Sequence, residues 1–327
     1  MTGTPVENHL GDLWSIFDFC NPGLLGTPTQ FKKYVKLLND ANDARAYGSL
    51  RRLVRPYILR RLKTDAAIAA HLPAKTEMIA ECGLTRKQAA IYQRAVNDLK
   101  DKLKNAEGIA RHGLVLSSLM QFKQICNHPA QYMNTGVFTP NESGKFERLH
   151  DLCEEILDRQ EKVLVFTQFK AMTQPIADYL STSFARPTLV LHGGTPVGKR
   201  AGLVKQFQSD DGPPFFVISL KAGGSGLNLT AASHVIHFDR WWNSAVENQA
   251  TDRAFRIGQA RNVLVHKFVC RGTVEERIDA MIRAKQNVAD QVLDGDGETP
   301  LTEMNDAELL RFVALDLDRA TSDDTPN

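Results

Sequence analysis

The second half of the chain alternates short apolar runs with segments of helical periodicity. The apolar runs are KVLVFT, PTLVLH, PFFVIS, SHVIHF and NVLVHKFV, all within residues 162–269. Such near-continuous runs of Val, Ile, Leu and Phe are typical of parallel strands that helices cover on both faces. The pattern therefore predicts a doubly wound α/β sheet, in which ligands gather at the carboxyl ends of the strands. One edge of this sheet is expected to collect the segments that follow Thr167, His192, Ser219 and Phe238.

The first half of the chain is mainly helical in its periodicity. Apolar residues recur at helical spacing in four places: residues 10–17, 27–65, 85–105 and 114–126. Thr85 is placed to cap the third of these segments, and Asn127, His128 and Pro129 halt the fourth. Residues 75–81 alternate as a short strand. Residues 135–144, rich in Gly, Pro, Asn and Ser, predict a loop and a boundary.

Composition narrows the class of protein. The 327 residues are 43% hydrophobic, which is enough for a sizeable core in one or two domains. No apolar run approaches the length of a membrane span, and the first ten residues lack the features of a secretory leader. The five cysteines are scattered without a CxxC pair, so neither a disulfide framework nor a metal site is indicated. A globular protein of a reducing cytoplasm fits best, with no membrane partner.

The net charge of +2 hides an uneven distribution of charged residues. Residues 51–63, RRLVRPYILRRLK, contain six cations, whereas residues 294–327 contain ten acids and two cations. The basic stretch could meet the phosphate backbone of a nucleic acid. From composition alone, the solvated face of a helical segment interrupted at Pro56 is an equally good interpretation.

A near match to a phosphate-binding P-loop lies at residues 193–200, GGTPVGKR. It has the spacing of a P-loop, follows an apolar run and opens a helix. However, Arg200 stands where a P-loop needs Ser or Thr to bind Mg²⁺, and Pro196 removes one backbone N–H from the cradle. We interpret the match as coincidental. A self-sufficient nucleotide-binding enzyme that uses Lys199 remains an alternative.

A helix predicted over residues 245–257 carries the clearest catalytic pattern. Four of its polar residues have the spacing i, i+3, i+4 and i+7, and so share one helical face: Gln249, Asp252, Arg253 and Arg256. The planar fork of arginine suits phosphate, and its charge can stabilise a transferring γ-phosphoryl group. An ordinary salt-bridged helix has the same spacing, and spacing alone slightly favours that plainer interpretation.

The segment KAGGSGLN at residues 221–228 places three glycines at the expected ligand edge. Backbone N–H groups there could approach phosphate, as could Lys221 and Ser225. Tight turns between a strand and a helix use the same residues, so this loop is weak evidence by itself. Trp241 and Trp242 follow the next apolar run, and either pack or present one ring to a nucleic acid.

Taken together, these segments resemble the C-terminal half of a Swi/Snf-type ATPase, a branch of the superfamily two helicase-like DNA translocases. The resemblance runs from Thr2 to about Phe312, and it implies a RecA-like lobe with helical insertions. The segments that carry it are TGTPVENHLGDLWS, YILRRLK, LPAK, QICNHP, KVLVFTQF, LHGGTPVGKR, SLKAGGSGLNL, QATDRAFRIGQ and TVEERI. They resemble motif three, the helical protrusions and the joint between lobes, motifs four to six, and the start of the C-terminal brace. The DRWWN variant is similar to bacterial members.

The resemblance implies a nucleotide site at motif six. Arg253 and Arg256 match the arginines that reach across the cleft to ATP held by the other lobe, and they are the expected catalytic residues. The expected nucleotide-binding residues around them are Gln249, Asp252, Gly224 and Gly226. ATP and Mg²⁺ are expected to be held mainly by the first lobe.

The resemblance also implies a path for double-stranded DNA. Motif four lies on that path, and motif five couples it to the nucleotide cleft. The expected nucleic-acid-binding residues are Gln168, Lys221, Gly223, Ser225, Asn228, Trp242, Asn243, Arg60, Arg61 and Lys63. Ser244 stands where many members have proline and Trp241 where many have an acid; family variation could explain both, and the resemblance does not define the local DNA contacts there.

The family's first lobe, with its P-loop and its acidic metal-binding box, has no counterpart in this sequence, which begins at motif three. The resemblance therefore implies that Met1 begins a fragment or a truncated reading frame, inactive by itself. The expected parts are the end of the first lobe with a helical protrusion (1–72), the second lobe with an insertion at about 85–140 (73–285), and brace helices with an acidic tail (286–327).

The function expected from this resemblance is ATP-dependent translocation on double-stranded DNA in the cytoplasm, associated with the nucleoid in a bacterium. Its partners are the first lobe and protein cargo on DNA. A different class of function stays open, since the basic helices could instead dock a protein partner in a non-enzymatic interaction module.

Overall fold

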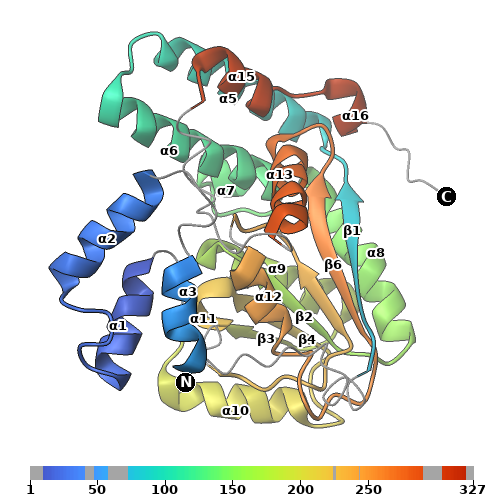
Figure 1. Ribbon diagram of the computed structural model, residues 1–327. Helices are drawn as coiled ribbons and strands as arrows, with labels where there is room; N and C mark the ends of the chain where they lie inside the picture. Colours follow the sequence, from blue (N-terminus) through green and yellow to red (C-terminus); the bar gives the residue numbers. More distant parts are fainter. Residues whose placement is uncertain are drawn as a thin grey trace. The chain divides into compact units, whose positions relative to one another are not determined.

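The computed structural model describes residues 10–40, 48–57, 73–223, 226–242, 244–289 and 304–321 (Figure 1). The chain divides into two compact units. One comprises residues 1–70 with 286–296, and the other comprises residues 71–285 with 297–327. The second, larger unit contains the sheet and the residues expected to carry the chemistry.

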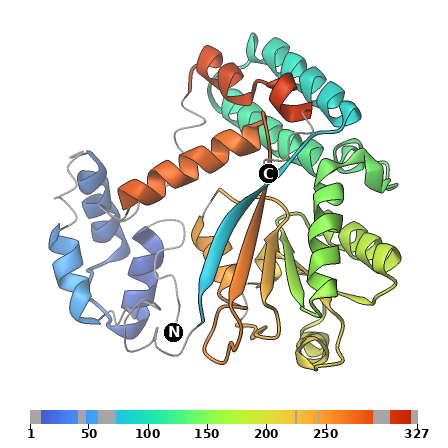
Figure 2. The same cartoon turned by 90° about the vertical axis from the view of Figure 1, so that its right-hand side faces the viewer.

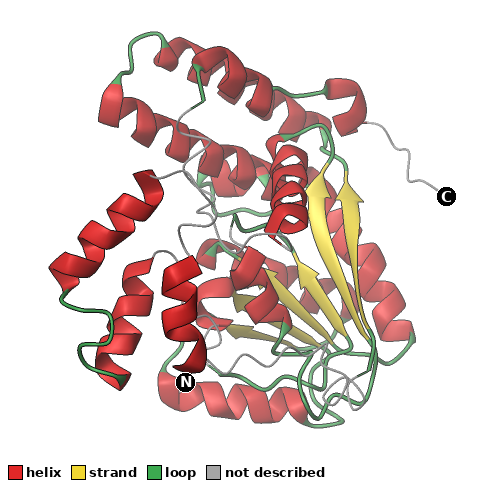
Figure 3. Ribbon diagram, in the orientation of Figure 1, coloured by secondary structure: helices red, strands yellow, loops and turns green. Residues whose placement is uncertain are grey.

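A six-stranded parallel sheet forms the centre of the larger unit (Figure 3). The strands lie in the order β1-β6-β5-β2-β4-β3. Their bounds are β1 Lys75–Cys82, β2 Val163–Thr167, β3 Thr188–Leu191, β4 Phe215–Ser219, β5 His234–His237 and β6 Val263–Cys270. The five apolar runs form β2 to β6, and the alternating segment at 75–81 forms β1. The prediction of a doubly wound parallel α/β sheet is confirmed.

The order of the strands reverses at β2, which lies in the middle of the sheet. The next two strands in sequence, β3 and β4, lie on one side of β2, whereas β5, β6 and β1 lie on the other. Thr167 pairs with Ser219, and the preceding Phe166 pairs with His237, so β2, β4 and β5 end at the same level. The expected shared edge is therefore present, and it lies where sheets of this kind bind ligands.

Helices cover both faces of the sheet, as the near-continuous apolar runs predict. Along β2 and β5, Val165 and Ile236 face the larger hydrophobic cluster, whereas Leu164 and Val235 face the second. The larger cluster is built with α5 Arg86–Leu103, α6 Gly108–Asn127, α8 Gly144–Asp158, α9 Lys170–Phe184 and α13 Val274–Ala289. The second is built with α10 Val197–Gln208 and α12 Ser244–Thr251.

Helices α5 and α6 pair with each other beyond the carboxyl ends of the strands (Figures 1 and 2). Thr85 caps α5, because its hydroxyl accepts from the Gln88 amide at 3.2 Å and the Gln88 side chain accepts from the Thr85 amide at 3.1 Å. This cap confirms the prediction at Thr85. Helix α6 begins at Gly108, six residues before the predicted start at Leu114. The added turns, which include Ile109, are mostly exposed, so no apolar periodicity marks them.

Two C-terminal helices, α15 Asp306–Val313 and α16 Leu317–Thr321, pack against α5. Arg277 of α13 donates to the carbonyls of Phe312 and Ala314 at 2.7 and 2.6 Å. The turn before α13 contains Gly272 at φ +65°, where a Cβ atom would lie 2.4 Å from the Asp316 carbonyl oxygen. This position therefore needs glycine both for its backbone angle and for the close approach.

The smaller unit is a cluster of short helices: α1 Leu10–Cys20, α2 Pro28–Asp40, α3 Gly48–Val54 and the 3₁₀ turn η1 Arg55–Tyr57. Its core consists of Leu13, Phe17, Phe31, Leu50 and Val54. The indole of Trp14 donates to the Gly26 carbonyl at 2.9 Å, which ties α1 to the loop before α2. The helices predicted at 10–17 and after residue 27 are confirmed within the described residues. None of the helices described is both long and apolar enough to cross a membrane.

His237, at the end of β5, makes stability depend on pH. Its ring is fully buried, and Nε2 lies 2.9 Å from the hydroxyl of Thr251 in α12. Burial lowers the pKa of His237 to about 4, with Lys267 and Arg240 acting in the same direction and Glu247 against it. The unfolded chain takes up this proton near pH 6.5, so the stability that depends on a neutral His237 is fully present above that pH. As the pH falls toward 4, the free energy of unfolding decreases by up to about 3 kcal/mol.

This loss can be measured by urea unfolding at pH 7 and pH 4.5. We expect His237→Asn to show a smaller decrease in unfolding free energy between the two pH values than the unaltered chain. His112→Gln, at an exposed position, serves as the matched control and should keep the full decrease. The same decrease in both variants would show that His237 is not the titrating group.

Candidate nucleotide and DNA site

Loops that follow three neighbouring strands meet at the carboxyl edge of the sheet. Gln168 directly follows β2, Lys221 lies in the short helix α11 Leu220–Gly223 that follows β4, and Trp242 lies in the loop after β5. Helix α11 contacts α12. The segment that follows α12 contains both arginines of motif six, Arg253 and Arg256. The structure thus brings the segments of motifs four, five and six into one region of the larger unit.

Arg253 and Arg256 lie in tight turns directly after α12. Arg253 is 9% exposed, whereas Arg256 is open to solvent. Burial and the nearby charge of Arg256 lower the pKa of Arg253, although Asp252 acts in the opposite direction. The two guanidinium groups are therefore close enough to repel each other. Such a pair of cations, one fixed and one accessible, suits an anionic ligand such as phosphate.

The helix predicted over residues 245–257 is wrong at its C-terminal end. Helix α12 stops at Thr251, and the amides of Arg253 and Ala254 then bond three residues back, at 3.1 and 3.0 Å. The Arg253 carbonyl instead accepts from the Leu229 amide at 2.9 Å. This bond ties motif six to the end of motif five, which a continuing helix would prevent. Gln249 and Asp252 consequently do not share one regular helical face with the two arginines.

The turn after Arg256 is held by a buried amide that sequence reasoning did not single out. Gln259 donates to the carbonyls of Ala232 and Ala254 at 2.8 and 3.1 Å, and accepts from the Arg261 amide at 2.9 Å. Its side chain thus fixes the motif-six turn to the segment that leads into β5. The sequence shows Gln259 only as a polar residue at the end of a turn. Such residues are common in exposed loops, so the buried role of Gln259 could not be recognised from the sequence.

The glycine-rich loop is described in part. Lys221 and Asn228 are exposed, and Gly226 has a left-handed backbone at φ +62°. Gly223 ends α11. Gly224 and Ser225 lie outside the described residues, as do Asn243, Arg60, Arg61 and Lys63. The predicted contacts of these residues with nucleotide or DNA remain predictions.

The segment that resembles a P-loop is folded back on itself. Arg200 donates through Nε to the Thr195 carbonyl at 3.0 Å, and the Gly194 amide donates to His192 Nδ1 at 3.0 Å. Pro196 stands at the N-cap of α10. A loop whose amide and guanidinium groups are already engaged is a poor cradle for phosphate, which supports the interpretation that the match is coincidental.

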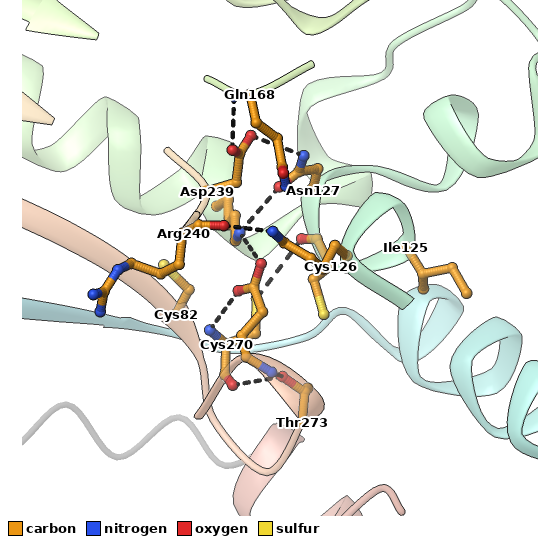
Figure 4. Close-up of polar contacts among 12 residues, drawn as sticks. Cys82, Ile125, Cys126, Asn127, Gln168, Asp239, Arg240, Cys270 and Thr273 are labelled. Carbon is orange, nitrogen blue, oxygen red and sulfur yellow. Dashed lines mark hydrogen bonds and ion pairs between the residues drawn. The ribbon is translucent and has the colours of Figure 1, made fainter. Parts of the chain in front are cut away.

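Asp239, two residues after β5, fixes the start of the motif-four loop. It is fully buried, and its Oδ1 accepts from the backbone amide of Gln168 at 2.8 Å. Its Oδ2 accepts from the hydroxyl of Thr167 at 2.6 Å and from Asn127 Nδ2 at 3.2 Å (Figure 4). Burial raises the pKa of Asp239, although Lys123 and Lys145 act in the opposite direction.

The side chain of Gln168 points inward in this structure. It extends toward Asn127 (Figure 4), and both of its amide polar atoms are buried without a hydrogen-bond partner. The expected DNA contact of Gln168 stays a prediction, since the amide does not reach the surface here.

Lys145 and Glu275 form an ion pair that is fully enclosed. Their charged atoms lie 2.7 Å apart, and neither side chain is exposed. Lys145 Nζ also donates to Asn127 Oδ1 at 3.0 Å, and Glu275 Oε2 accepts from the Cys270 amide at 3.1 Å. Burial lowers the pKa of Lys145, but Glu275 and its neighbours outweigh this effect and the net pKa is raised. Asn127 therefore joins this pair to Asp239 in one buried network.

Two cysteines lie beside this network. The ligand atoms of Cys126, Cys270 and Glu275 lie within 4.8 Å of one another. However, Cys270 Sγ already donates to the Cys126 carbonyl at 3.7 Å, and the Lys145 ammonium holds Glu275. An adjacent ammonium disfavours a metal cation, so these residues do not fit a metal site.

Lys123 lies under the two tryptophans that follow β5. Its Nζ lies 5.9 Å from the ring centroid of Trp241 and 5.0 Å from that of Trp242, and it donates to the Arg240 carbonyl. Burial lowers the pKa of Lys123 to about 8, against the charges of Asp239 and Glu275. Both tryptophans are half-buried: Trp242 packs against the larger hydrophobic cluster and Trp241 against the second. Packing in the core therefore accounts for the buried part of each ring.

Sequence reasoning missed this buried charged network. Its members come from five separate segments: Lys123, Asn127, Lys145, Asp239, Arg240, Glu247, Glu275 and Asp279. A weak signal exists at Lys123, because the lysine stands among apolar residues in LMQFKQIC. A charge at such a position must be paired when it is buried, but the sequence does not reveal the partner.

Two protein-family models match the chain. They are the SNF2-related domain over residues 1–131 and the helicase conserved C-terminal domain over residues 144–258. The chain is 45% identical over 318 residues to YwqA of Bacillus subtilis, a candidate ATP-dependent helicase/translocase, covering 96% of this chain and 34% of YwqA. It is 34% identical over 307 residues to the Zorya protein ZorD of Escherichia coli, covering 89% of this chain and 28% of ZorD. The chain thus spans about a third of these relatives.

Solved structures of SWI2/SNF2 ATPases from Sulfolobus solfataricus share the fold. The ATPase core in complex with double-stranded DNA is 40% identical, with a TM-score of 0.67, covering 96% of this chain and 66% of that one. The C-terminal domain is 37% identical, with a TM-score of 0.62, covering 74% of this chain and 99% of that one. These neighbours confirm the prediction of a RecA-like fold.

Proposed function

The chain belongs to the SNF2 family of ATP-dependent helicase-like proteins, and from this premise we propose that it is the second motor lobe of a double-stranded DNA translocase. The observation that carries the proposal is the pair Arg253 and Arg256, close together with only one of them open to solvent. The backbone amide of Leu229, at the end of motif five, donates to the carbonyl of Arg253. An anion bound at the arginines and a nucleic acid bound at motif five would therefore contact segments that are bonded to each other.

In this proposal, Arg253 and Arg256 stabilise negative charge on the transferring phosphoryl group of ATP. The cradle for ATP and Mg²⁺ belongs to another part of the intact protein, because the loop at residues 193–200 does not fit one. Bound Mg²⁺ supplies charge neutralisation at the phosphates. Gln249 and Asp252 support the arginines, and Gly224 and Gly226 line the nucleotide side of motif five. Residues 1–72 close the first lobe, residues 73–285 form the second, and residues 286–327 brace it.

The exposed residues of the carboxyl edge make the DNA contacts in this proposal. Lys221 and Asn228 are open to solvent after β4, and they contact the phosphate backbone of one strand. The related Sulfolobus core was solved in complex with double-stranded DNA, which supports DNA as the partner. Gripping the backbone predicts binding that is independent of sequence and sensitive to salt. The protein acts where DNA is, at the nucleoid in a bacterium, and displaces proteins from it.

The experiment that tests the function compares this chain with the intact protein that contains it. ATP hydrolysis is measured for both, with and without double-stranded DNA. We expect hydrolysis only in the intact protein, with a clear increase when DNA is added. Equal hydrolysis by this chain alone would overturn the proposal and favour a self-sufficient enzyme. A stable protein complex without DNA affinity or hydrolysis would favour an interaction module.

A further inference from the structure

Two consecutive buried residues in the loop after β5 hold two different parts of the proposed site. Asp239 and Arg240 are 0% and 2% exposed. The carboxylate of Asp239 accepts from the backbone amide of Gln168, where the motif-four loop starts. The guanidinium of Arg240 turns instead toward α12, the helix that precedes Arg253. One rigid dipeptide thus contacts both the DNA side and the nucleotide side.

The contact with α12 is an ion pair with a bifurcated hydrogen bond from one guanidinium nitrogen. Arg240 Nε donates to both carboxylate oxygens of Glu247 at 3.0 and 3.2 Å, and the Trp241 amide donates to Glu247 Oε1 at 2.6 Å. Glu247 lies in the first turn of α12 and is 1% exposed. Burial opposes the ionisation of Glu247, but Arg240 outweighs it, and the pKa of Glu247 is lowered. The first turn of α12 therefore cannot shift without moving the loop after β5.

Arg240 also reaches α13. Its Nη1 donates to Asp279, which in turn pairs with Arg283 at 2.7 Å. The Arg240 carbonyl accepts from Lys123 of α6. The dipeptide is thus fixed from α6 and α13, while it fixes the motif-four loop and α12 in turn.

We propose that Asp239, Arg240 and Glu247 are positioning residues that couple DNA contact at the motif-four loop to the placement of Arg253 and Arg256. The inference rests on the proposed function. Because α6 and α13 anchor the dipeptide, Asp239 holds the start of the motif-four loop while Arg240 holds α12 through Glu247, so the loop and the helix that precedes Arg253 keep one fixed arrangement. All three side chains are buried, and so act on the site only through the groups that they hold.

The test uses the intact protein and the Glu247→Gln variant, which keeps the shape of the side chain and removes its charge. The measured quantity is the stimulation ratio, the kcat with saturating double-stranded DNA divided by the kcat without DNA. We expect the ratio to fall about 10-fold to 100-fold, because small displacements of catalytic groups cost that much. DNA affinity without nucleotide and the KM for ATP should change by less than about threefold, because the Glu247 side chain is buried and is not open to either ligand.

The ratio separates coupling from simple instability. A variant that is only partly folded loses kcat with and without DNA by the same factor, which leaves the ratio unchanged. Arg240→Lys is the second variant; it keeps the charge but loses the separate nitrogens that contact Glu247 and Asp279 together, and should lower the ratio less than Glu247→Gln does. Glu142→Gln, which breaks an exposed pair with Lys87, is the matched control and should leave the ratio unaltered.

An unchanged ratio in Glu247→Gln, with wild-type protein that DNA stimulates, would overturn the coupling and leave the proposed function standing. A loss of DNA affinity equal to the loss of stimulation would also overturn it, because Glu247 would then act through DNA binding alone. Absence of stimulation in the wild-type protein would overturn both the function and the inference.

Discussion

Replacing Arg256 with alanine in the intact protein is expected to reduce DNA-stimulated ATP hydrolysis by about 10³-fold or more. An arginine that stabilises the charge of a transferring phosphoryl group contributes factors of this size. Arg256 is exposed, so its truncation removes a charge without leaving a cavity or an unpaired buried group. The measurement is the steady-state rate of phosphate release with saturating DNA, compared with the unaltered protein.

Two further variants make this result specific to the arginine. Arg256→Lys keeps the charge but loses the planar fork, and we expect it to recover only a small part of the rate. Lys199→Ala removes an exposed cation from the P-loop-like segment and should leave the rate unchanged. A normal rate in Arg256→Ala would contradict the catalytic role of Arg256. A large loss in Lys199→Ala would instead favour nucleotide binding at residues 193–200.

The sheet could be predicted because its signal is local. Each of β2 to β6 lies in a near-continuous apolar run, and both faces of the sheet are covered, so hydrophobicity marks the strands. The cap at Thr85 is local as well, because the capping box needs only Thr85 and Gln88. Features that depend on residues within one turn or one strand are therefore readable from the chain.

The end of α12 could not be predicted, because a distant residue decides it. Residues 245–257 have helical periodicity, but the Leu229 amide takes the Arg253 carbonyl and the chain turns at Thr251. The sequence contains no local sign of this competition, because residues 245–257 include no proline or glycine. The spacing of the arginines suggested the right residues, although the regular helical face that it implied is absent.

The buried charged network was missed for a related reason. Lys145 and Glu275 are separated by 130 residues, and either residue alone is typical of an exposed surface. Only the fold shows that both side chains are enclosed and that each neutralises the other. A resemblance to a family identifies the segments that contain these residues, but it assigns them no partner.

Replacing Lys145 with methionine is expected to destabilise the larger unit by about 3–5 kcal/mol. Methionine keeps much of the volume of lysine, so the main effect is the Glu275 carboxylate left in the interior without a cation. Asn127 also loses the ammonium that donates to its Oδ1. The change should appear in thermal unfolding as a melting temperature lower by about 10 °C. Lys87→Met, which breaks an exposed pair with Glu142, is the matched control and should cost less than about 1 kcal/mol.

A double-mutant cycle then shows whether the cost comes from the unpaired charge. Glu275→Gln alone leaves the Lys145 ammonium buried with only Asn127 as an acceptor, so it too should be strongly destabilising. In the double variant Lys145→Met/Glu275→Gln no charge is left without its partner, and the cost should be smaller than the sum of the single costs by about 1–3 kcal/mol. Additive costs would mean that packing, and not charge, dominates at this site. The buried network would then be a consequence of the fold and would not hold α6, α8 and α13 together.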